Sequence, residues 1–340
     1  MAAFWQLPLD EATSELFAFH TVRGTYRYRR MPFGYKNASA EMQRVTEELI
    51  GSDPCRVCFI DDIVLGAAER TKNPEMATIA NLDRLLHKME KLNLTCQVEK
   101  CTFFPQEVNL LGYQIKDNRI RPHPERLRKL LAMEPPNDKL GLQRALGVAA
   151  VFREFIPKYA DLTLPLTDAL KKNTMGTQQD VQKAHKKLLE AVATLTALTP
   201  YDEEAHMIVE TDASEVAASG VIWQQRPGSK ELQPLVFFSK KFSGSQCNWP
   251  ITQKELYGLL YAIARYRKWL VSRRFTHVTD HQAVLGLVKQ LHKHEGRLGR
   301  WLLTLGQYDF ACEYSETLIG YLVATPRNLP TMKWTGNSMK

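Results

Sequence analysis

Two adjacent carboxylates interrupt an apolar stretch in the N-terminal third of the chain. Asp61 and Asp62 stand between the apolar segments 57–60 and 63–65. Carboxylates in such a strand–turn–strand pattern cannot stay ionised and dry without a counter-charge. A hard divalent cation can supply it, because it takes carboxylate oxygen as a ligand. The pattern indicates a metal site, but an exposed hairpin, in which Asp-Asp is ordinary turn chemistry, explains it as well.

A second set of acids is spread over the C-terminal part of the chain. Asp212 and Asp280 each end a predicted strand, and Glu255 lies early in a predicted helix. Strand ends in a mixed sheet are where sites gather, and three acids could hold two metal ions for in-line phosphoryl displacement. Taken separately, the two aspartates could equally be helix N-caps and the glutamate a solvated helix residue. The spacing alone leaves both interpretations open.

The cysteines offer a third possible metal site. Cys55 and Cys58, and Cys96 and Cys101, have spacings that zinc ligands use. Cys58, however, lies in an apolar run in which a small hydrophobic residue suits a buried strand. Cys101 precedes two phenylalanines in a similar setting. We expect structural, buried cysteines.

The elements that must position these residues alternate between strands and helices in the first third of the chain. Hydrophobic periodicity predicts helices over residues 39–50 and 76–92. Strands are expected over residues 16–21 and 25–29, with a turn between them, and around residues 109–115. This third is therefore expected to be mixed α/β.

The middle of the chain is expected to be helical. Segments begin near Pro124, Leu140, Tyr159 and Gln178, and prolines including Pro165 are expected to break them. A second α/β region opens at Pro200. In it we predict a three-stranded meander over residues 206–209, 219–225 and 235–239, followed by a helix over 253–269 and strands over 275–279 and 310–314.

Composition limits the class of protein. The 340 residues, 44% of them hydrophobic, suffice for two or three domains with apolar cores. No stretch approaches the ~18 consecutive apolar residues that span a bilayer, and the N-terminal segment lacks the pattern of a secretory signal. We therefore expect no membrane association and no secretion, and six cysteines favour a reducing compartment. The formal net charge of +8 is a modest lean toward a polyanionic partner.

Several motifs in a fixed order identify a family. They are WQLPLD at 5–10, RMPFGYKNA at 30–38, FIDD at 59–62, LGY at 111–113, IPKYA at 156–160 and PLT at 165–167. In this order the chain resembles the polyprotein reverse transcriptases of Ty3/gypsy-type long-terminal-repeat (LTR) retrotransposons, over about residues 1–330. The resemblance implies an RNA-directed DNA polymerase, a nucleotidyltransferase, with a ribonuclease H domain.

The resemblance also implies an architecture of the α/β (α+β) class. Residues 1–120 match a right-hand polymerase palm with fingers, incomplete at the N-terminus, and residues 121–175 match a helical thumb. Residues 176–204 match a helical linker, and residues 205–330 match an RNase H-like domain built on a mixed sheet.

Roles in polymerisation carry over to particular residues. Asp61 and Asp62 match the family's aromatic-x-Asp-Asp hairpin, whose carboxylates help to bind two divalent ions, Mg²⁺ or Mn²⁺. Phe4 matches the aromatic residue that excludes a ribose 2′-hydroxyl. Phe33 and Gly34 match the segment nearest the incoming deoxynucleoside triphosphate.

A second group of residues matches positions that handle the primer. Leu111, Gly112 and Tyr113 match the family's primer-positioning hairpin. Lys100 falls near a family lysine that donates a proton to the leaving pyrophosphate. The implied partners are an RNA template, a DNA primer and deoxynucleoside triphosphates.

In the C-terminal region, Asp212, Glu255 and Asp280 match the first three of four metal-binding acids of RNase H. Two ions there activate water against the RNA strand of an RNA–DNA hybrid. Strand choice would depend on the 2′-hydroxyl and on the shape of the hybrid. His281 and Gln282 follow Asp280 as in the family, and we assign them no catalytic role.

Two departures from the family bear on activity. The family's first polymerase carboxylate falls before Met1, so we expect an N-terminally truncated pol fragment with impaired polymerase activity. The place of the fourth RNase H acid is taken by Ala324 or Thr325, beside the helix breaker Pro326. We expect residual nuclease activity, better with manganese. The alternative is a non-catalytic nucleic-acid-binding relic or domesticated protein.

Partners and compartment follow from the resemblance as well. Basic segments at 125–129, 171–172, 183–187 and 265–268 could contact phosphates, although each is also explained as a solvated helix face. Other pol polyprotein segments are possible partners. By resemblance the protein would work in a cytoplasmic particle or in the nucleus.

Overall fold

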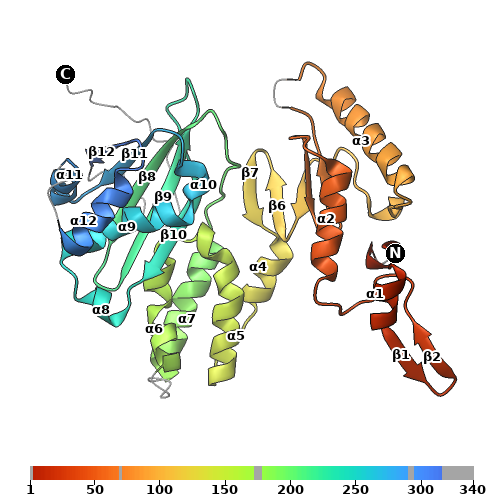
Figure 1. Ribbon diagram of the computed structural model, residues 1–340. Coiled ribbons are helices and arrows are strands. Elements are labelled where there is room, and N and C mark those ends of the chain that lie inside the picture. The colour runs from red at the N-terminus through yellow and green to blue at the C-terminus, as the bar shows by residue number, and fades with distance from the viewer. Residues whose placement is uncertain (1–2, 69–70, 172–177, 290–294, 316–340) are drawn as a thin grey trace. The chain divides into compact units, whose positions relative to one another are not determined.

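The computed structural model describes residues 3–68, 71–171, 178–289 and 295–315, and the chain divides into two compact units, Met1–Phe104 and Pro105–Lys340. Figure 1 shows both units, the first in red to orange and the second from yellow to blue. Both mix helices with strands, as the sequence predicts.

The first unit is built around two hairpins and two long helices. Its core lies where α2 and α3 pack beside the β3–β4 hairpin, and it comprises Leu49, Ile50, Leu85, Met89 and Leu94. The elements are η1 (Ala3–Gln6), α1 (Glu11–Leu16), β1 (Ala18–Thr21), β2 (Gly24–Arg27), α2 (Ala38–Ile50), β3 (Arg56–Phe59), β4 (Asp62–Leu65), α3 (Pro74–Lys91) and η2 (Val98–Lys100).

The start of the first predicted strand is wrong. Leu16 ends the short helix α1, and the strand β1 begins only at Ala18. The helix forms because Asp10 caps it: its carboxylate accepts a hydrogen bond from the Thr13 backbone N–H at 2.8 Å. Such a cap satisfies an N–H group that has no partner within the helix.

The second unit begins with a small sheet and continues into helices. The strand β7, which ends at Pro122, was not predicted. The elements are β5 (Val108–Leu110), β6 (Tyr113–Lys116), β7 (Arg119–Pro122), α4 (Pro124–Leu131), α5 (Lys139–Ala149), η3 (Ala150–Phe155), α6 (Tyr159–Lys171) and α7 (Gln178–Ala193).

The helices α4, α5, α6 and α7 begin within one residue of their predicted starts, and they share one core. Leu130, Leu142, Leu166 and Leu188, from four different helices, are all fully buried in it. The prediction that Pro165 breaks the chain is wrong, since Pro165 lies inside α6. The packing of the neighbouring Leu166 offsets the loss of the backbone hydrogen bond that a proline cannot form. None of the described helices is both long and apolar enough to cross a membrane.

A five-stranded sheet in the order β10-β9-β8-β11-β12 completes the second unit. The predicted meander is confirmed, because β8, β9 and β10 are consecutive antiparallel neighbours, while β11 is parallel to both β8 and β12. The elements are β8 (His206–Ala213), β9 (Ala217–Gln225), β10 (Leu232–Lys241), α8 (Gly244–Cys247), α9 (Ile251–Arg265), α10 (Arg267–Leu270), β11 (Phe275–Thr279), α11 (Gln282–Val288), α12 (Gly296–Leu305) and β12 (Phe310–Tyr314).

Both faces of this sheet are covered. Helices α9 and α12 lie across one face (Figure 1), where Met207 and Val209 of β8 pack against Leu256 and Leu259. The opposite face, which carries Ile208, packs against Phe155 of η3. Residues alternate between the two faces because side chains in a strand point in opposite directions in turn.

Candidate metal centre

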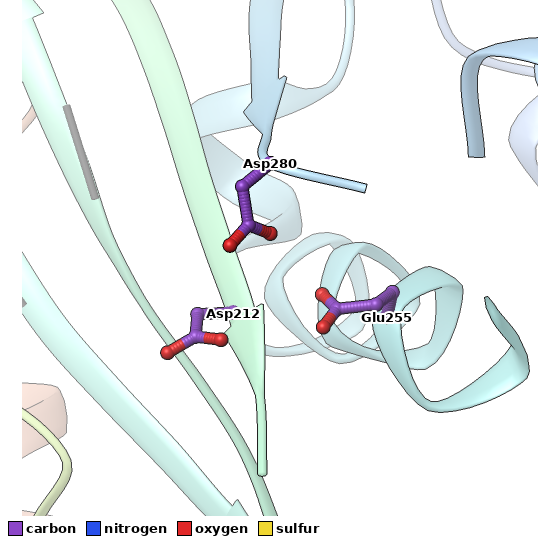
Figure 2. A group of neighbouring side chains, drawn as sticks. All are labelled: Asp212, Glu255 and Asp280. Atoms are coloured by element: carbon purple, nitrogen blue, oxygen red, sulfur yellow. The ribbon is translucent and has the colours of Figure 1, made fainter. Parts of the chain in front are cut away.

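Three carboxylates converge at one edge of the five-stranded sheet (Figure 2). Asp212 is the penultimate residue of β8, Asp280 directly follows β11, and Glu255 lies in the second turn of α9. Because β8 and β11 are parallel neighbours, their C-terminal ends meet at the same edge. One oxygen from each carboxylate lies within 4.8 Å of the others. Among the described residues these three form the one group of His, Cys, Asp or Glu side chains able to share a metal ion.

Glu255 is held in a buried position with half of its carboxylate unsatisfied. Only 5% of the residue is exposed, and Oε1 accepts a hydrogen bond from the Ala213 backbone N–H at 3.1 Å. Oε2 is buried and has no hydrogen-bond partner. Burial, together with the nearby carboxylates of Asp212 and Asp280, raises the pKa of the Glu255 carboxyl to about 8. This geometry contradicts the alternative of a solvated helix residue.

The two aspartates are more open to solvent than Glu255. Burial and the nearby Asp212 raise the pKa of the Asp280 carboxyl. Asp212 forms an ion pair with Lys158, whose Nζ lies 2.5 Å from Oδ2. Neither aspartate caps a helix: Asp212 lies within β8, and the N-cap position of α11 is His281. The alternative of two helix caps is therefore wrong.

The three carboxylates fit a divalent cation. They offer hard oxygen donors, which Mg²⁺ and Mn²⁺ prefer. The unsatisfied Oε2 of Glu255 and the mutual repulsion of the three groups are both relieved when a cation lies between them.

A further acid near the triad, which is buried, was missed by the sequence analysis. Glu210 precedes Asp212 by two residues on β8 and is fully buried, with Oε2 accepting a hydrogen bond from Nε1 of Trp223 at 2.7 Å. Oε1 has no hydrogen-bond partner, and burial raises the pKa of Glu210 to about 7. A glutamate inside an otherwise apolar strand was the available signal.

Next to this acid, a buried histidine ties β8 to β11 and β12. His277 is fully buried, and its ring nitrogens lie 2.9 Å from Oγ1 of Thr211 and 3.3 Å from Sγ of Cys312. Burial lowers the pKa of His277 to about 3, so the ring is neutral at physiological pH. His277 therefore acts as a structural bridge behind the triad.

Asp61 and Asp62 lie at the exposed turn of the β3–β4 hairpin, in the first unit. Two contacts from α2 fix the turn at Ile60, whose φ is +56°. Oε1 of Gln43 accepts a hydrogen bond from the Ile60 N–H at 2.6 Å, and Oγ1 of Thr46 donates one to the Ile60 carbonyl at 2.8 Å. Both carboxylates are solvated, and within the described residues neither joins a group of three metal-ligating side chains.

The residues matched to nucleotide binding also lie in the first unit. Phe4 and Phe33 contact each other edge to face, with ring centroids 5.9 Å apart. Phe33 is 57% exposed, so most of its ring is available to a ligand. Gly34 has a φ of +83°, a conformation that favours glycine. The structure thus brings Phe4 and Phe33 together.

The residues matched to primer positioning form a tight hairpin in the second unit. Leu110 pairs with Tyr113, which leaves Leu111 and Gly112 as a two-residue turn in which both residues have a positive φ. A Cβ atom at Gly112 would lie 1.8 Å from the Arg126 guanidinium. The Tyr113 ring stacks on Phe155 with centroids 5.9 Å apart.

Other predicted residues fall outside any assembled site. Lys100 is exposed on η2. The expectation that Cys101 is buried is wrong, since Cys101 is exposed and the phenylalanines after it, Phe103 and Phe104, are 55% and 56% exposed. The positions of the fourth acid, Ala324 or Thr325, and Lys172 lie outside the described residues.

Comparison with known sequences gives two family matches. Residues 1–115 match the reverse transcriptase (RNA-dependent DNA polymerase) family. Residues 202–308 match the RNase H-like domain found in reverse transcriptase, and this match contains the whole triad.

Curated relatives match most of the chain. A retrovirus-related Pol polyprotein from transposon 297 of Drosophila melanogaster is 30% identical over 315 residues, which are 92% of this chain and 29% of that protein. The transposon Tf2-3 polyprotein of Schizosaccharomyces pombe is 28% identical over 319 residues, 92% of this chain and 24% of that protein. The chain thus spans less than a third of the length of these relatives.

Solved structures show the same fold. The foamy viral protease-reverse transcriptase dRH in complex with double-stranded DNA has a TM-score of 0.80 at 18% identity, covering 93% of this chain and 56% of that one. The same viral protein in complex with an RNA/DNA hybrid has a TM-score of 0.77 at 19% identity, covering 100% of this chain and 45% of that one. The fold prediction of a polymerase palm followed by an RNase H-like mixed sheet is confirmed. The chain thus joins a region similar to reverse transcriptases to an RNase H-like region, and its curated relatives are transposon polyproteins, which supports an LTR retrotransposon reverse transcriptase.

Proposed function

We propose that this chain acts in RNA-directed DNA synthesis, and that its C-terminal domain hydrolyses the RNA strand of the RNA–DNA hybrid so formed. The observation that carries the nuclease half is the convergence of Asp212, Glu255 and Asp280 within 4.8 Å. The structural neighbours bound to double-stranded DNA and to an RNA/DNA hybrid support nucleic acid of this shape as the ligand.

The residues of the triad would hold Mg²⁺ or Mn²⁺, two ions by family resemblance. When bound, such ions activate a water molecule and stabilise charge on the reacting phosphate. The Ala213 N–H orients Glu255, and burial keeps its carboxylate away from bulk water. Because burial raises the pKa of Glu255 to about 8, the metal-free site holds a proton at neutral pH, and cation binding releases it.

The polymerase half rests on the residues of the first unit. Asp61 and Asp62 would bind the metal ions of polymerisation, while Phe4, Phe33 and Gly34 would face the deoxynucleoside triphosphate. The exposed hairpin suits this role, because both carboxylates are accessible. The primer would lie against the hairpin at Leu111–Tyr113.

The motif order further supports the Ty3/gypsy subtype, with other segments of a pol polyprotein as partners. It also supports the domain limits inferred from the sequence, namely palm and fingers to residue 120, thumb to 175, linker to 204 and the RNase H-like domain from 205. Each of these finer assignments is part of the proposal.

The test uses an RNA–DNA hybrid labelled on the RNA strand, incubated with the purified chain in Mg²⁺ and, in parallel, in Mn²⁺. We expect cleavage that disappears in Asp212→Asn and persists in Asp61→Asn. Extension of a DNA primer on an RNA template should instead be lost in Asp61→Asn and persist in Asp212→Asn. Cleavage that survives Asp212→Asn would come from a contaminant and would remove the support for the nuclease.

A second candidate function is nucleic-acid binding without catalysis. The observation that favours it is the ion pair between Lys158 and Asp212, because a triad acid is already neutralised by the protein itself. Tight, salt-sensitive binding of the hybrid with no hydrolysis in either metal would establish this alternative.

A further inference from the structure

One cation of the protein reaches into the candidate metal centre. Nζ of Lys158 lies 2.5 Å from Oδ2 of Asp212, and the two side chains are 31% and 17% exposed. Among the residues that the structure describes, no other Lys or Arg forms an ion pair with a triad carboxylate. Lys254, next to Glu255 on α9, instead donates to the Glu215 carbonyl at 3.1 Å.

The position of Lys158 is fixed by the fold around it. It lies between η3 and α6 with a φ of +50°, a conformation that few residues other than glycine adopt. On its N-terminal side, Phe155 is buried against the sheet face that carries Ile208. Both features place the lysine at the sheet independently of its ion pair.

Contacts on the C-terminal side hold the same segment to the sheet. The Ala160 N–H donates to Oγ of Ser239 at 2.9 Å, and Oγ of Ser214 donates to Oδ1 of Asp161 at 2.6 Å. Two helical turns further on, Nζ of Lys241 lies 2.5 Å from Oδ1 of Asp168. These contacts hold the start of α6 against the sheet, and Lys158, which directly precedes α6, therefore lies next to Asp212.

The ammonium group of Lys158 affects the binding of a metal ion by the triad. Once Glu255 has released its proton, as metal binding requires, the three carboxylates carry a charge of −3, and Lys158 reduces the net charge to −2. It also lies against one of the two oxygens that Asp212 can offer to a metal ion. Like charges a few ångströms apart repel strongly in a partly buried site. A divalent ion must therefore displace Lys158 from Asp212 or bind beside another cation.

We propose that Lys158 is a positioning residue that competes with divalent metal for Asp212 and so weakens metal binding at the triad. The inference rests on the proposed function, because it takes the triad to be the metal site. Without metal, Lys158 stabilises the cluster of acids. With metal, its release from Asp212 is part of the cost of binding.

Metal affinity can be measured directly by titrating the full-length chain with Mn²⁺ in a calorimeter. Lys158→Met keeps the length of the side chain and removes its charge, so its affinity should rise tenfold or more. Lys241→Met is the matched control, since it removes a lysine between the same helix and sheet without touching the triad, and it should bind as the unmodified chain does. Asp212→Asn identifies the heat that belongs to the triad.

Thermal unfolding separates competition from a merely structural role. Lys158→Met should lower the melting temperature of the metal-free protein and show a larger rise on addition of Mn²⁺ than the unmodified chain. Lys158→Arg should restore both the stability and the weak binding. A structural role alone would lower the melting temperature equally with and without metal.

The outcomes are distinguishable. Equal affinity of the unmodified chain and Lys158→Met, with binding lost in Asp212→Asn, overturns the competition and leaves the proposed function intact. Absence of any binding that depends on Asp212, in all variants, overturns the metal site itself and the competition with it.

Discussion

The two acidic sites of this chain differ in how their carboxylates are assembled. Asp61 and Asp62 are neighbours in the sequence, and the hairpin turn leaves both exposed to water. Asp212, Glu255 and Asp280 come from three elements, and the fold presses them together with Glu255 buried. Asp61 and Asp62 thus remain solvated, whereas the carboxylates of the triad repel one another. Among the described residues, the triad is therefore the group of acids whose mutual repulsion a bound cation would relieve.

The largest effect is expected for a substitution in the triad, which should abolish one activity of the chain and leave the other unchanged. Asp212→Asn removes a contact that would act on the developing charge of the transition state, and losing one such contact costs about 10²–10³ in rate. We expect hydrolysis of the hybrid to fall by this factor, measured by release of labelled RNA fragments. Asp61→Asn is the control and should leave hydrolysis unchanged. A comparable loss in Asp61→Asn would contradict the independence of the two sites.

An effect of intermediate size should appear in the pH dependence of stability. Burial raises the pKa of Glu255 to about 8, so the folded, metal-free protein retains a proton that the unfolded chain releases near its ordinary value of 4.5. The contribution of Glu255 to the free energy of unfolding should therefore fall as the pH rises from about 4.5 to 8.

Chemical denaturation at a series of pH values measures this slope. Glu255→Gln should remove its share, and the pH dependence that remains includes Glu210, whose pKa is raised by burial to about 7, and His277, whose lowered pKa acts in the opposite direction. Saturating Mg²⁺ should flatten the slope of the unmodified chain as well, because a bound cation favours the ionised form. An unchanged slope in Glu255→Gln would show that its carboxyl titrates normally.

The smallest effect concerns the turn that carries Asp61 and Asp62. Gln43→Ala removes the hydrogen bond from the Ile60 N–H to Oε1 of Gln43, and such a bond contributes about 1 kcal/mol. We expect a loss of that order in the stability of the first unit and slower primer extension, with hydrolysis of the hybrid unchanged. Glu90→Ala, at an exposed position of α3, is a control far from the turn in sequence. Equal losses in both variants would mean that the turn does not depend on Gln43.

The features that the sequence predicted well are those set by local signals. Helices begin at Pro124, Lys139, Tyr159 and Gln178, within one residue of their expected starts. A proline in the first turn and the N-cap Asp138 mark two of these starts in the sequence itself. Alternation of apolar residues likewise placed the meander, although β8 extends to Ala213, beyond the predicted strand.

The features that were missed depend on contacts between distant segments. Pro165 stays helical because of packing around Leu166, and Cys101 is exposed although its neighbours are aromatic. Glu210 is paired with Trp223 across two strands. Lys158 lies in a motif that the sequence identified, but its contact with Asp212 requires the whole docked segment. The three acids of the triad could be predicted from the sequence, whereas their counter-charge, Lys158, could not.

The burial of Phe155 against the five-stranded sheet has a practical consequence for separating the parts of this protein. The region matched as RNase H-like begins at residue 202, after η3 and α6. Expressing that region alone would leave Ile208, Val221 and Trp223 without the side chains that cover them. Uncovered apolar surface of this kind promotes aggregation. A recombinant fragment intended to stay dispersed should therefore begin near Pro105, where the second compact unit starts.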